Sequence, residues 1–259
     1  MQQTSLLYRQ ILTSEPHWFE TSIVIGESGV LITEYADVIT FGGTAIIVSR
    51  NSPDSGYREE RLVSVKTSSR MFDDSPTVGQ AIAQEIEVQM IKPATDIGTM
   101  AQVVPYVRVC NAENVSEWIQ QGMFYIDTRE ETHDVSGLTI MTFHGFDAML
   151  MTEQYYSASS LSFPAVDTAV VSEIANKIGV TVDSRTWTIM TNAYRVQAPT
   201  AYTYREVLGY IAAMYVGSWI ISETGQLRLV SFLELPVETN LLVDSIGDYI
   251  VFGVDRIKV

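Results

Sequence analysis

The stretch that decides the fold runs from Trp118 to Leu150 and reads WIQQGMFYIDTREETHDVSGLTIMTFHGFDAML. Within 124–129 and again within 138–144, every second residue belongs to one set and the residues between them to another. This is the two-residue period of a β-strand, whose successive side chains face opposite sides of the sheet. The connector 130–137 is polar and ends in Ser-Gly, which supplies the positive φ that a tight reversal needs. The sequence therefore predicts a long antiparallel hairpin, rich in the aromatic and β-branched residues that suit a half-buried sheet.

Upstream of this hairpin the chain is rich in short strands separated by turns. One or two helical turns are expected over 4–12, and a linker is expected over 98–105. A loop is expected at 51–60 (NSPDSGYREE), because Pro, Gly, Asp and Ser cluster there with charged residues. Strands are predicted at 18–25, 30–34, 37–39, 45–48, 61–67, 84–92 and 106–110. About eight strands in this first part are typical of a barrel or a sandwich.

The pattern changes after Ala148. A Ser-rich linker over 157–164 leads to a predicted helix that ends near Ile178, with Asp167 or Thr168 as its N-cap. Its apolar residues share one face at helical spacing, namely Val170, Val171, Ile174, Ala175 and Ile178. Gly179 follows where a C′ glycine belongs, and residues 180–182 are predicted to form a short strand.

A second helix is predicted to begin at Thr203, because Thr203 and Glu206 have the spacing of a capping box. Gly217 is expected to end this helix, and a second hairpin is expected over 218–230. Residues 165–232 therefore read as a compact α+β unit of helix, excursion, helix and hairpin.

Strands are also predicted at 249–252 and 256–259. The sequence stops inside the second of these strands, with no polar residues after Val259. We therefore expect either that more chain follows or that this last strand pairs with a partner.

Length and charge narrow the class of protein. The 259 residues suffice for one large or two modest domains, and the 46% hydrophobic content suffices for a sizeable core. A net charge of −15, from 31 acidic and 16 basic residues, disfavours nonspecific binding to DNA or RNA and docking on anionic lipid. It favours solubility, and it also suits a conduit that must not retain nucleic acid. No apolar run approaches the ~18–20 residues that span a bilayer, and the single cysteine, Cys110, excludes an internal disulfide.

The three histidines, His17, His133 and His144, are too sparse for the short, regular ligand spacing of a metal site. His133 lies near Glu130, Glu131 and Asp134, which we interpret as a solvated polar loop tip rather than a cation site. His144 with Asp147 could form a catalytic pair, but no Gly-x-Ser-x-Gly elbow supplies a nucleophile.

The remaining candidates for chemistry have simpler structural explanations. Asp127 and its acidic neighbours are crowded into a polar turn, whereas paired glycosidase carboxylates need one acid in a dry pocket. Gly42-Gly43 lacks the context of a phosphate-binding loop. Core packing explains Trp118, Trp187 and Trp219 better than stacking on bases or sugars does. We therefore predict no catalytic, cofactor-binding or metal-binding residues, and no cofactor.

Four segments follow one another in an order that resembles a known family. They are QGMFYIDT at 121–128, LTIMTFHGFDAM at 138–149, FPAVDTAVVSEIANKI at 163–178 and TYREVLGYIAAMYVGSWIISETGQLRL at 203–229. This series resembles the hub proteins at the tail tip of long-tailed bacteriophages, including the N-terminal module of tail-associated lysin proteins. The individual motifs are short, so their order and spacing carry the resemblance, which covers most of residues 60–232.

The resemblance implies an α+β fold, mainly β, with tube-related β-barrel domains and a small inserted α+β domain. Residues 1–150 would be the first barrel, 165–232 the insertion, and 235–259 the start of a second barrel. Three copies would form a ring at the distal end of the phage tail, within the virion. The hub would cap and continue the tail tube.

The implied partners are the tail tube, distal tail and tape-measure proteins and a tail fibre or receptor-binding protein, with no sequence-specific nucleic acid binding and no stable membrane insertion. Two other classes stay open at this point. A tail-associated cell-wall hydrolase would need a dry pocket with a shifted acid or a nucleophile. A carbohydrate-binding β-sandwich would show its aromatic residues on one concave face.

Overall fold

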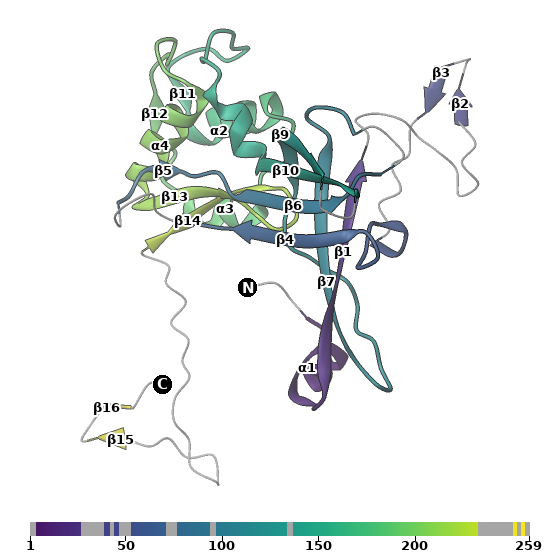
Figure 1. Ribbon diagram of the computed structural model, residues 1–259. Coiled ribbons are helices and arrows are strands. Elements are labelled where there is room, and N and C mark those ends of the chain that lie inside the picture. The colour runs from purple at the N-terminus through teal and green to yellow at the C-terminus, as the bar shows by residue number, and fades with distance from the viewer. Residues whose placement is uncertain are drawn as a thin grey trace.

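The computed structural model describes residues 4–26, 39–41, 44–46, 53–70, 77–93, 97–133, 137–232, 251–252 and 255–256 (Figure 1). Its helices are α1 (Leu6–Thr13), α2 (Asp167–Lys177), α3 (Ser184–Ile189) and α4 (Tyr204–Met214), with 3-10 turns η1 (Pro53–Ser55) and η2 (Ala148–Glu153). None of the helices in these ranges is long and apolar enough to cross a membrane.

A seven-stranded antiparallel sheet dominates the first part of the chain. Its strand order is β1-β7-β9-β10-β6-β4, and β8 pairs with β7 beside this path. The strands are β1 (His17–Gly26), β4 (Leu62–Ser68), β6 (Glu85–Ile91), β7 (Gln102–Asn111), β8 (Ile119–Gln120), β9 (Phe124–His133) and β10 (Thr139–Asp147). In Figure 1, β1 and β7 cross the direction of β4, β6, β9 and β10, so the sheet folds over its own core. The expected α+β fold, mainly β, is confirmed.

The predicted hairpin is present as β9 and β10, with Phe124 opposite Asp147 and His133 opposite Thr139. Residues 130–133 belong to β9, so the polar connector is shorter than expected. The register shifts beside Gly145, where Thr128 faces His144 but Ile126 faces Gly145. A Cβ on Gly145 would lie 2.6 Å from the Tyr125 carbonyl oxygen, so the close backbone approach at this bulge requires glycine.

The linker expected over 98–105 is wrong, because β7 begins at Gln102 and contains Pro105. Proline fits here for a geometric reason. Pro105 lies opposite Ile23 of β1, and the N–H and C=O of Ile23 point away from β7, to Tyr57. Ile23 and Pro105 are thus a non-hydrogen-bonded pair, in which proline costs β1 no hydrogen bond.

The strands that the structure describes do not close into the expected barrel, since β1 and β4 are the two ends of the sheet order. One bridge joins β1 to the segment before β4, in which the Ile23 and Tyr57 amides donate to each other's carbonyls at 2.9 and 2.8 Å. After Tyr57 the chain makes a turn, with Leu62 N donating to Arg58 O at 2.8 Å. This turn separates the chain from β1 just before β4 begins, so strand pairing does not continue.

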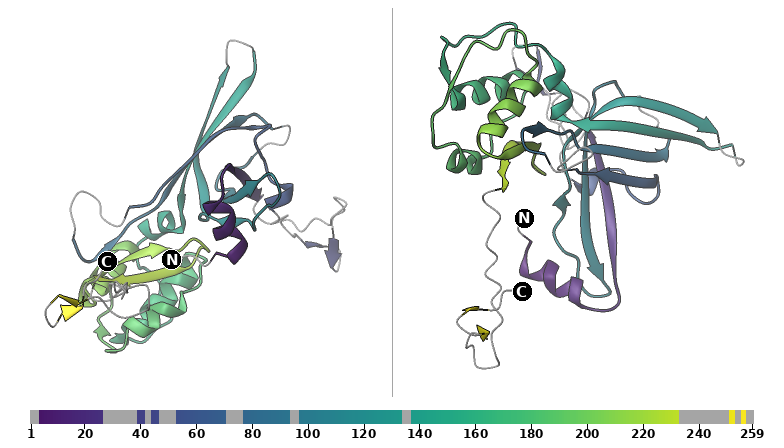
Figure 2. Two further views of the ribbon diagram at one scale, coloured as in Figure 1. Left: turned by 90° about the horizontal axis from the view of Figure 1, so that it is seen from below. Right: turned by 90° about the vertical axis from the view of Figure 1, so that its left-hand side faces the viewer.

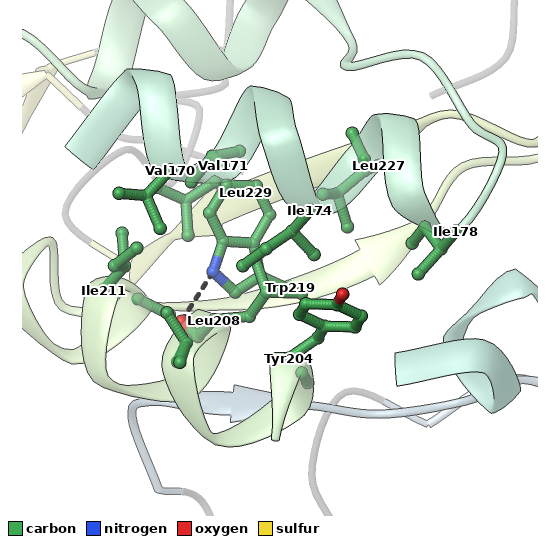
Figure 3. Close-up of a cluster of buried hydrophobic side chains, with 14 of the residues drawn as sticks. Val170, Val171, Ile174, Ile178, Tyr204, Leu208, Ile211, Trp219, Leu227 and Leu229 are labelled. Carbon is green, nitrogen blue, oxygen red and sulfur yellow. Dashed lines mark hydrogen bonds between the residues drawn. The ribbon is translucent and has the colours of Figure 1, made fainter. Parts of the chain in front are cut away.

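The segment after β10 forms a second hydrophobic core around a small sheet. The sheet order is β14-β13-β5, with β13 (Gly217–Ile221), β14 (Leu227–Ser231) and β5 (Gln80–Ala81), and β5 runs parallel to β13. Helices α2 and α4 enclose Trp219, whose indole N–H donates to the Leu208 carbonyl at 2.8 Å (Figure 3). The core side chains of α2 include Val170, Val171 and Ile174, as the helical spacing predicted.

The ends of the two main helices match the sequence signals only in part. The capping box of Thr203 and Glu206 is confirmed, and Gly179 has a φ of +76° at the end of α2. The N-cap of α2 is Val166, without a side-chain bond. Asp167 is instead buried in the first turn, where the Tyr215 hydroxyl donates to its carboxylate at 2.5 Å.

Glycine at the end of α4 has a different role from the expected one. Val216, not Gly217, adopts the positive φ, at +50°. Gly217 begins β13, where a Cβ would lie 2.4 Å from the Val230 carbonyl oxygen. Gly217 therefore allows the close strand pairing and does not stop the helix.

The sequence did not indicate α3, β5 or the pair β11 (Ala165–Val166) and β12 (Arg195–Val196). The strand predicted over 180–182 reduces to a single parallel bridge between Val182 and Leu227. Two further two-stranded pairs are β2 (Ile39–Phe41) with β3 (Thr44–Ile46), and β15 (Val251–Phe252) with β16 (Asp255–Arg256). The strand predicted at 30–34 lies outside the described residues, as do parts of those predicted at 37–39, 45–48, 249–252 and 256–259.

Candidate functional site

The three histidines lie in separate environments. His17 Nδ1 is 2.7 Å from the Ser14 carbonyl, His133 Nδ1 is 3.1 Å from the Thr139 hydroxyl, and His144 Nδ1 is 3.9 Å from the Glu87 carboxylate. Across the described part of the chain, no three His, Cys, Asp or Glu side chains form a group that could hold a metal ion.

Asp147 is a structural carboxylate and does not pair with His144. It is 1% exposed, whereas His144, three residues earlier on β10, has a half-exposed side chain. The Asp147 carboxylate caps η2 by accepting from Met149 N at 2.9 Å, and it also accepts from Gln84 N at 3.0 Å. Burial raises the pKa of Asp147 to about 7, although both backbone hydrogen bonds act to lower it. This residue joins the large sheet to the turn that leads into the α+β unit.

The acidic residues of the hairpin are exposed, as expected, but they lie on β9 and not in a turn. Asp127, Glu130 and Glu131 are all exposed. Lys92 Nζ lies 2.8 Å from the Glu131 carboxylate. Asp134 lies outside the described residues. An exposed strand face of this kind lacks the desolvated acid that glycoside hydrolysis requires.

The tryptophans divide into buried and surface residues. Trp219 is fully buried, as expected. Trp187 is exposed, and core packing is the wrong explanation for Trp118. The guanidinium carbons of Arg108 and Arg58 lie 4.2 and 5.5 Å from the Trp118 ring centroid, which is a cation–π arrangement.

Carboxylates complete this cluster around Trp118. The indole N–H donates to Asp54 Oδ1 at 3.0 Å, and this bond holds the pKa of Asp54 below its usual value. Arg108 Nη2 lies 2.6 Å from the Glu20 carboxylate, and its hydrogen bonding lowers the pKa of Glu20. The cluster ties η1 to the face of β1 and β7, next to the point where β1 and the segment before β4 meet. Sequence spacing could not show this cluster, because its members come from four separate segments.

The two ends of the large sheet present exposed apolar side chains. Phe19 on β1 is 51% exposed, and Val63 on β4 is 57% exposed. Between the two strands lies an open groove of about 240 Å³, lined in part by Phe19, Thr21 and Leu62 to Val65. We call this surface the open seam. Terminal strands with exposed apolar side chains are suited to pairing with another chain.

The β9–β10 hairpin forms a projecting arm. Figure 2 shows its far end extending away from the helices. β7 pairs with β9 only at Tyr125 and Phe124. Beyond Ile126 the outer side of β9 therefore faces no strand within the described ranges, and its residues 127–133 are exposed. The arm and the open seam thus present exposed strand edges, which are suited to pairing with another chain.

The sequence matches no family model and no curated protein. Among solved structures, the chain is similar to the 43 kDa tail protein of prophage MuSo2 from Shewanella oneidensis, with a TM-score of 0.50 and 12% identity over 83% of this chain and 56% of that one. A tail protein from Neisseria meningitidis MC58 gives a TM-score of 0.46 and 12% identity over 85% of this chain and 53% of that one. The half-lidded Francisella PdpA-VgrG complex gives 0.42 and 6% identity over 83% and 31%.

The first of these likenesses shows a shared fold. The chain spans 56% of the length of the Shewanella oneidensis tail protein and 53% of the Neisseria protein. The chain is thus structurally similar to a phage tail protein, as the resemblance in its sequence implies.

Proposed function

We propose that this chain is a structural subunit of a phage tail and that it acts as the tail-tip or baseplate hub, which caps and continues the tail tube. The observation that carries the proposal is the open seam, which leaves exposed apolar residues at both ends of a large sheet. A wall subunit needs such edges, because neighbouring copies extend the sheet and cover them. The fold shared with the prophage MuSo2 tail protein supports this role.

The two hydrophobic cores support a division of the chain into separate structural domains. Residues 1–150 form the tube-like wall, with a core that includes Ile23, Phe124 and Phe143. Residues 165–232 form the inserted α+β unit, with its core around Trp219. Residues 235–259 begin a second tube-related domain, a proposal that rests on the sequence resemblance.

The proposed assembly is a ring of three copies at the distal end of the virion tail. Its neighbours are the tail tube, distal tail and tape-measure proteins above and a fibre or receptor-binding protein below. The net charge of −15 per chain supports a lumen that does not retain the passing genome, because carboxylates repel phosphates. The protein is then not an enzyme, does not read DNA sequence and does not insert stably in a membrane.

No observation favours the alternative of a cell-wall hydrolase. Such an enzyme needs a desolvated acid that faces a substrate pocket. Asp147 is a buried carboxylate, but its two oxygens accept hydrogen bonds from the backbone of Gln84 and Met149. Its position is therefore that of a structural cap.

Native mass spectrometry with negative-stain imaging of the full chain tests the proposal. We expect a closed hollow ring for the natural protein and single subunits for Val63→Lys, which places a charge in the open seam. Val115→Lys is the matched control, because Val115 is also exposed but lies in the connection between β7 and β8. A natural protein that stays a single subunit, or a Val63→Lys variant that assembles normally, contradicts the proposal.

A further inference from the structure

A second surface, separate from the open seam, lies between residues 78–85 and α4. It is an open groove of about 830 Å³, which lies within the size range of ligand-binding clefts. Most of its lining is apolar, and these residues are Val78, Ala81, Ile82, Ala83, Phe146, Leu150, Tyr210 and Ala213. We call it the α4 groove.

Helix α4 is apolar on two sides. One side buries Val207, Leu208 and Ile211 in the α+β core. The other side exposes Tyr210, which is 58% exposed, and Met214 one turn further on. A helix with apolar residues on both sides is normally covered on both, but none of the described residues covers Tyr210 and Met214 on the outer side of α4.

Aromatic side chains extend the apolar surface beyond the groove. Tyr202 packs edge-on against Tyr210, with ring centroids 5.3 Å apart. Tyr155 is exposed, and its backbone bridges to Thr203, the N-cap of α4. Tyrosines clustered at a groove are typical of protein interfaces, because they bury a large apolar area and keep a polar end.

The wall of the groove is rigidly built. A Cβ on Gly209 would lie 2.6 Å from the Gly79 carbonyl oxygen, so α4 and the segment before β5 are in direct backbone contact. Gly79 N also donates to the Gly217 carbonyl at 2.7 Å, at the start of β13. The groove is therefore formed before any partner arrives, which lowers the entropic cost of binding.

The charges at the groove are unbalanced in favour of carboxylates. Glu85 and Glu206 both line it and are exposed. The positive charge of Arg205, which also lines it, is matched by Glu153, whose carboxylate lies 2.8 Å from Arg205 Nε. The groove therefore combines an apolar floor with a net negative rim, and it is complementary to a cationic amphipathic partner.

The same charges argue against a second copy of this chain as the occupant. In a twofold contact the same patch meets itself, so the Glu206 carboxylates of the two copies would approach each other. Each chain also carries a net charge of −15. Like charges brought together at an interface cost affinity.

We propose that the α4 groove docks a short amphipathic segment of another tail protein, with an apolar anchor side chain against Tyr210 and flanking Lys or Arg residues facing Glu85 and Glu206. This inference rests on the proposed tail function for the source of the segment. The proposed contact lies on the α+β unit and is separate from the contacts through the open seam that close the ring.

Fluorescence anisotropy with two labelled synthetic peptides tests this proposal on the full chain. One peptide is an amphipathic Leu/Lys sequence, and the other is its Leu/Glu counterpart. We expect the Leu/Lys peptide to bind, Tyr210→Ser to weaken it by about tenfold or more, and Glu85→Gln to weaken it less. Val115→Ser is the matched control, because Val115 is also exposed but lines neither the α4 groove nor the open seam, and it should leave binding unchanged.

Three outcomes of the peptide measurement overturn the inference. They are absence of Leu/Lys peptide binding, equal binding of the Leu/Glu peptide, and binding that Tyr210→Ser leaves unchanged. A shift of the natural protein's oligomeric state by Tyr210→Ser would identify a second copy as the occupant and would also overturn it. Native mass spectrometry of the same samples separates the two proposals, because ring formation without peptide binding contradicts only the groove, and peptide binding without a ring contradicts only the hub.

Discussion

Replacing Asp147 with Asn should change how the stability of this protein depends on pH. Asp147 is 1% exposed and joins the large sheet to η2 through hydrogen bonds from Gln84 N and Met149 N. Its pKa is raised by burial from 3.8 to about 7. The folded state therefore binds this proton more tightly than the unfolded state does. The stability that this group contributes is complete below pH 3.8 and is lost as the pH rises to about 7.

The size of the effect follows from the two pKa values. Their difference, at about 1.4 kcal/mol per pKa unit, corresponds to about 4 kcal/mol in all. Between pH 5 and pH 8 the same two values give a loss of about 2–3 kcal/mol in the free energy of unfolding. Asn has no charge to lose, but it accepts only one of the two backbone hydrogen bonds, and the other N–H group is left buried at a cost of about 1–3 kcal/mol.

Urea unfolding of the natural protein and Asp147→Asn at pH 5 and pH 8 measures this effect. All other titrating groups are common to both proteins, so the comparison isolates residue 147. We expect the variant to be less stable than the natural protein at pH 5, and we expect this deficit to disappear or reverse at pH 8. Equal pH dependence of the two proteins would refute the assignment of a buried, protonated Asp147.

Three substitutions test other parts of the structure by urea unfolding. Trp118→Ala should cost about 1–3 kcal/mol through the lost cation–π contacts and the hydrogen bond to Asp54, and a loss near zero would contradict this. Ile174→Ala should cost about 2–5 kcal/mol, because it opens a cavity beside Trp219; a loss below that range would show that the site collapses. Gly145→Ala should destabilise by about 1–3 kcal/mol through the clash at the bulge, whereas Gly26→Ala, with no such clash, should cost less.

Local signals in the sequence predicted those elements that local chemistry specifies. The alternation around Phe124 and Phe143 predicted the hairpin, and the spacing of Thr203 and Glu206 predicted the start of α4. Both depend on residues close in sequence. The N-cap of α2 was misplaced because Tyr215, far along the chain, draws the Asp167 carboxylate inward.

Features that depend on distant segments could not be predicted in this way. Barrel closure was expected from the number of strands, but the turn after Tyr57 decides that β4 leaves β1. β5 is too short to show a period, and its pairing with β13 comes from a segment that lies far away in sequence. The cluster around Trp118 and the lining of the α4 groove also combine residues from several elements. The spacing of residues along the sequence therefore does not indicate either of them.

Electron cryomicroscopy of the purified full chain tests most directly whether this protein is a wall subunit. We predict a hollow ring in which the open seam of each copy, which includes Phe19 and Val63, lies against a neighbouring copy. A solitary protomer, or a ring whose contacts leave β1 and β4 facing solvent, would contradict that account.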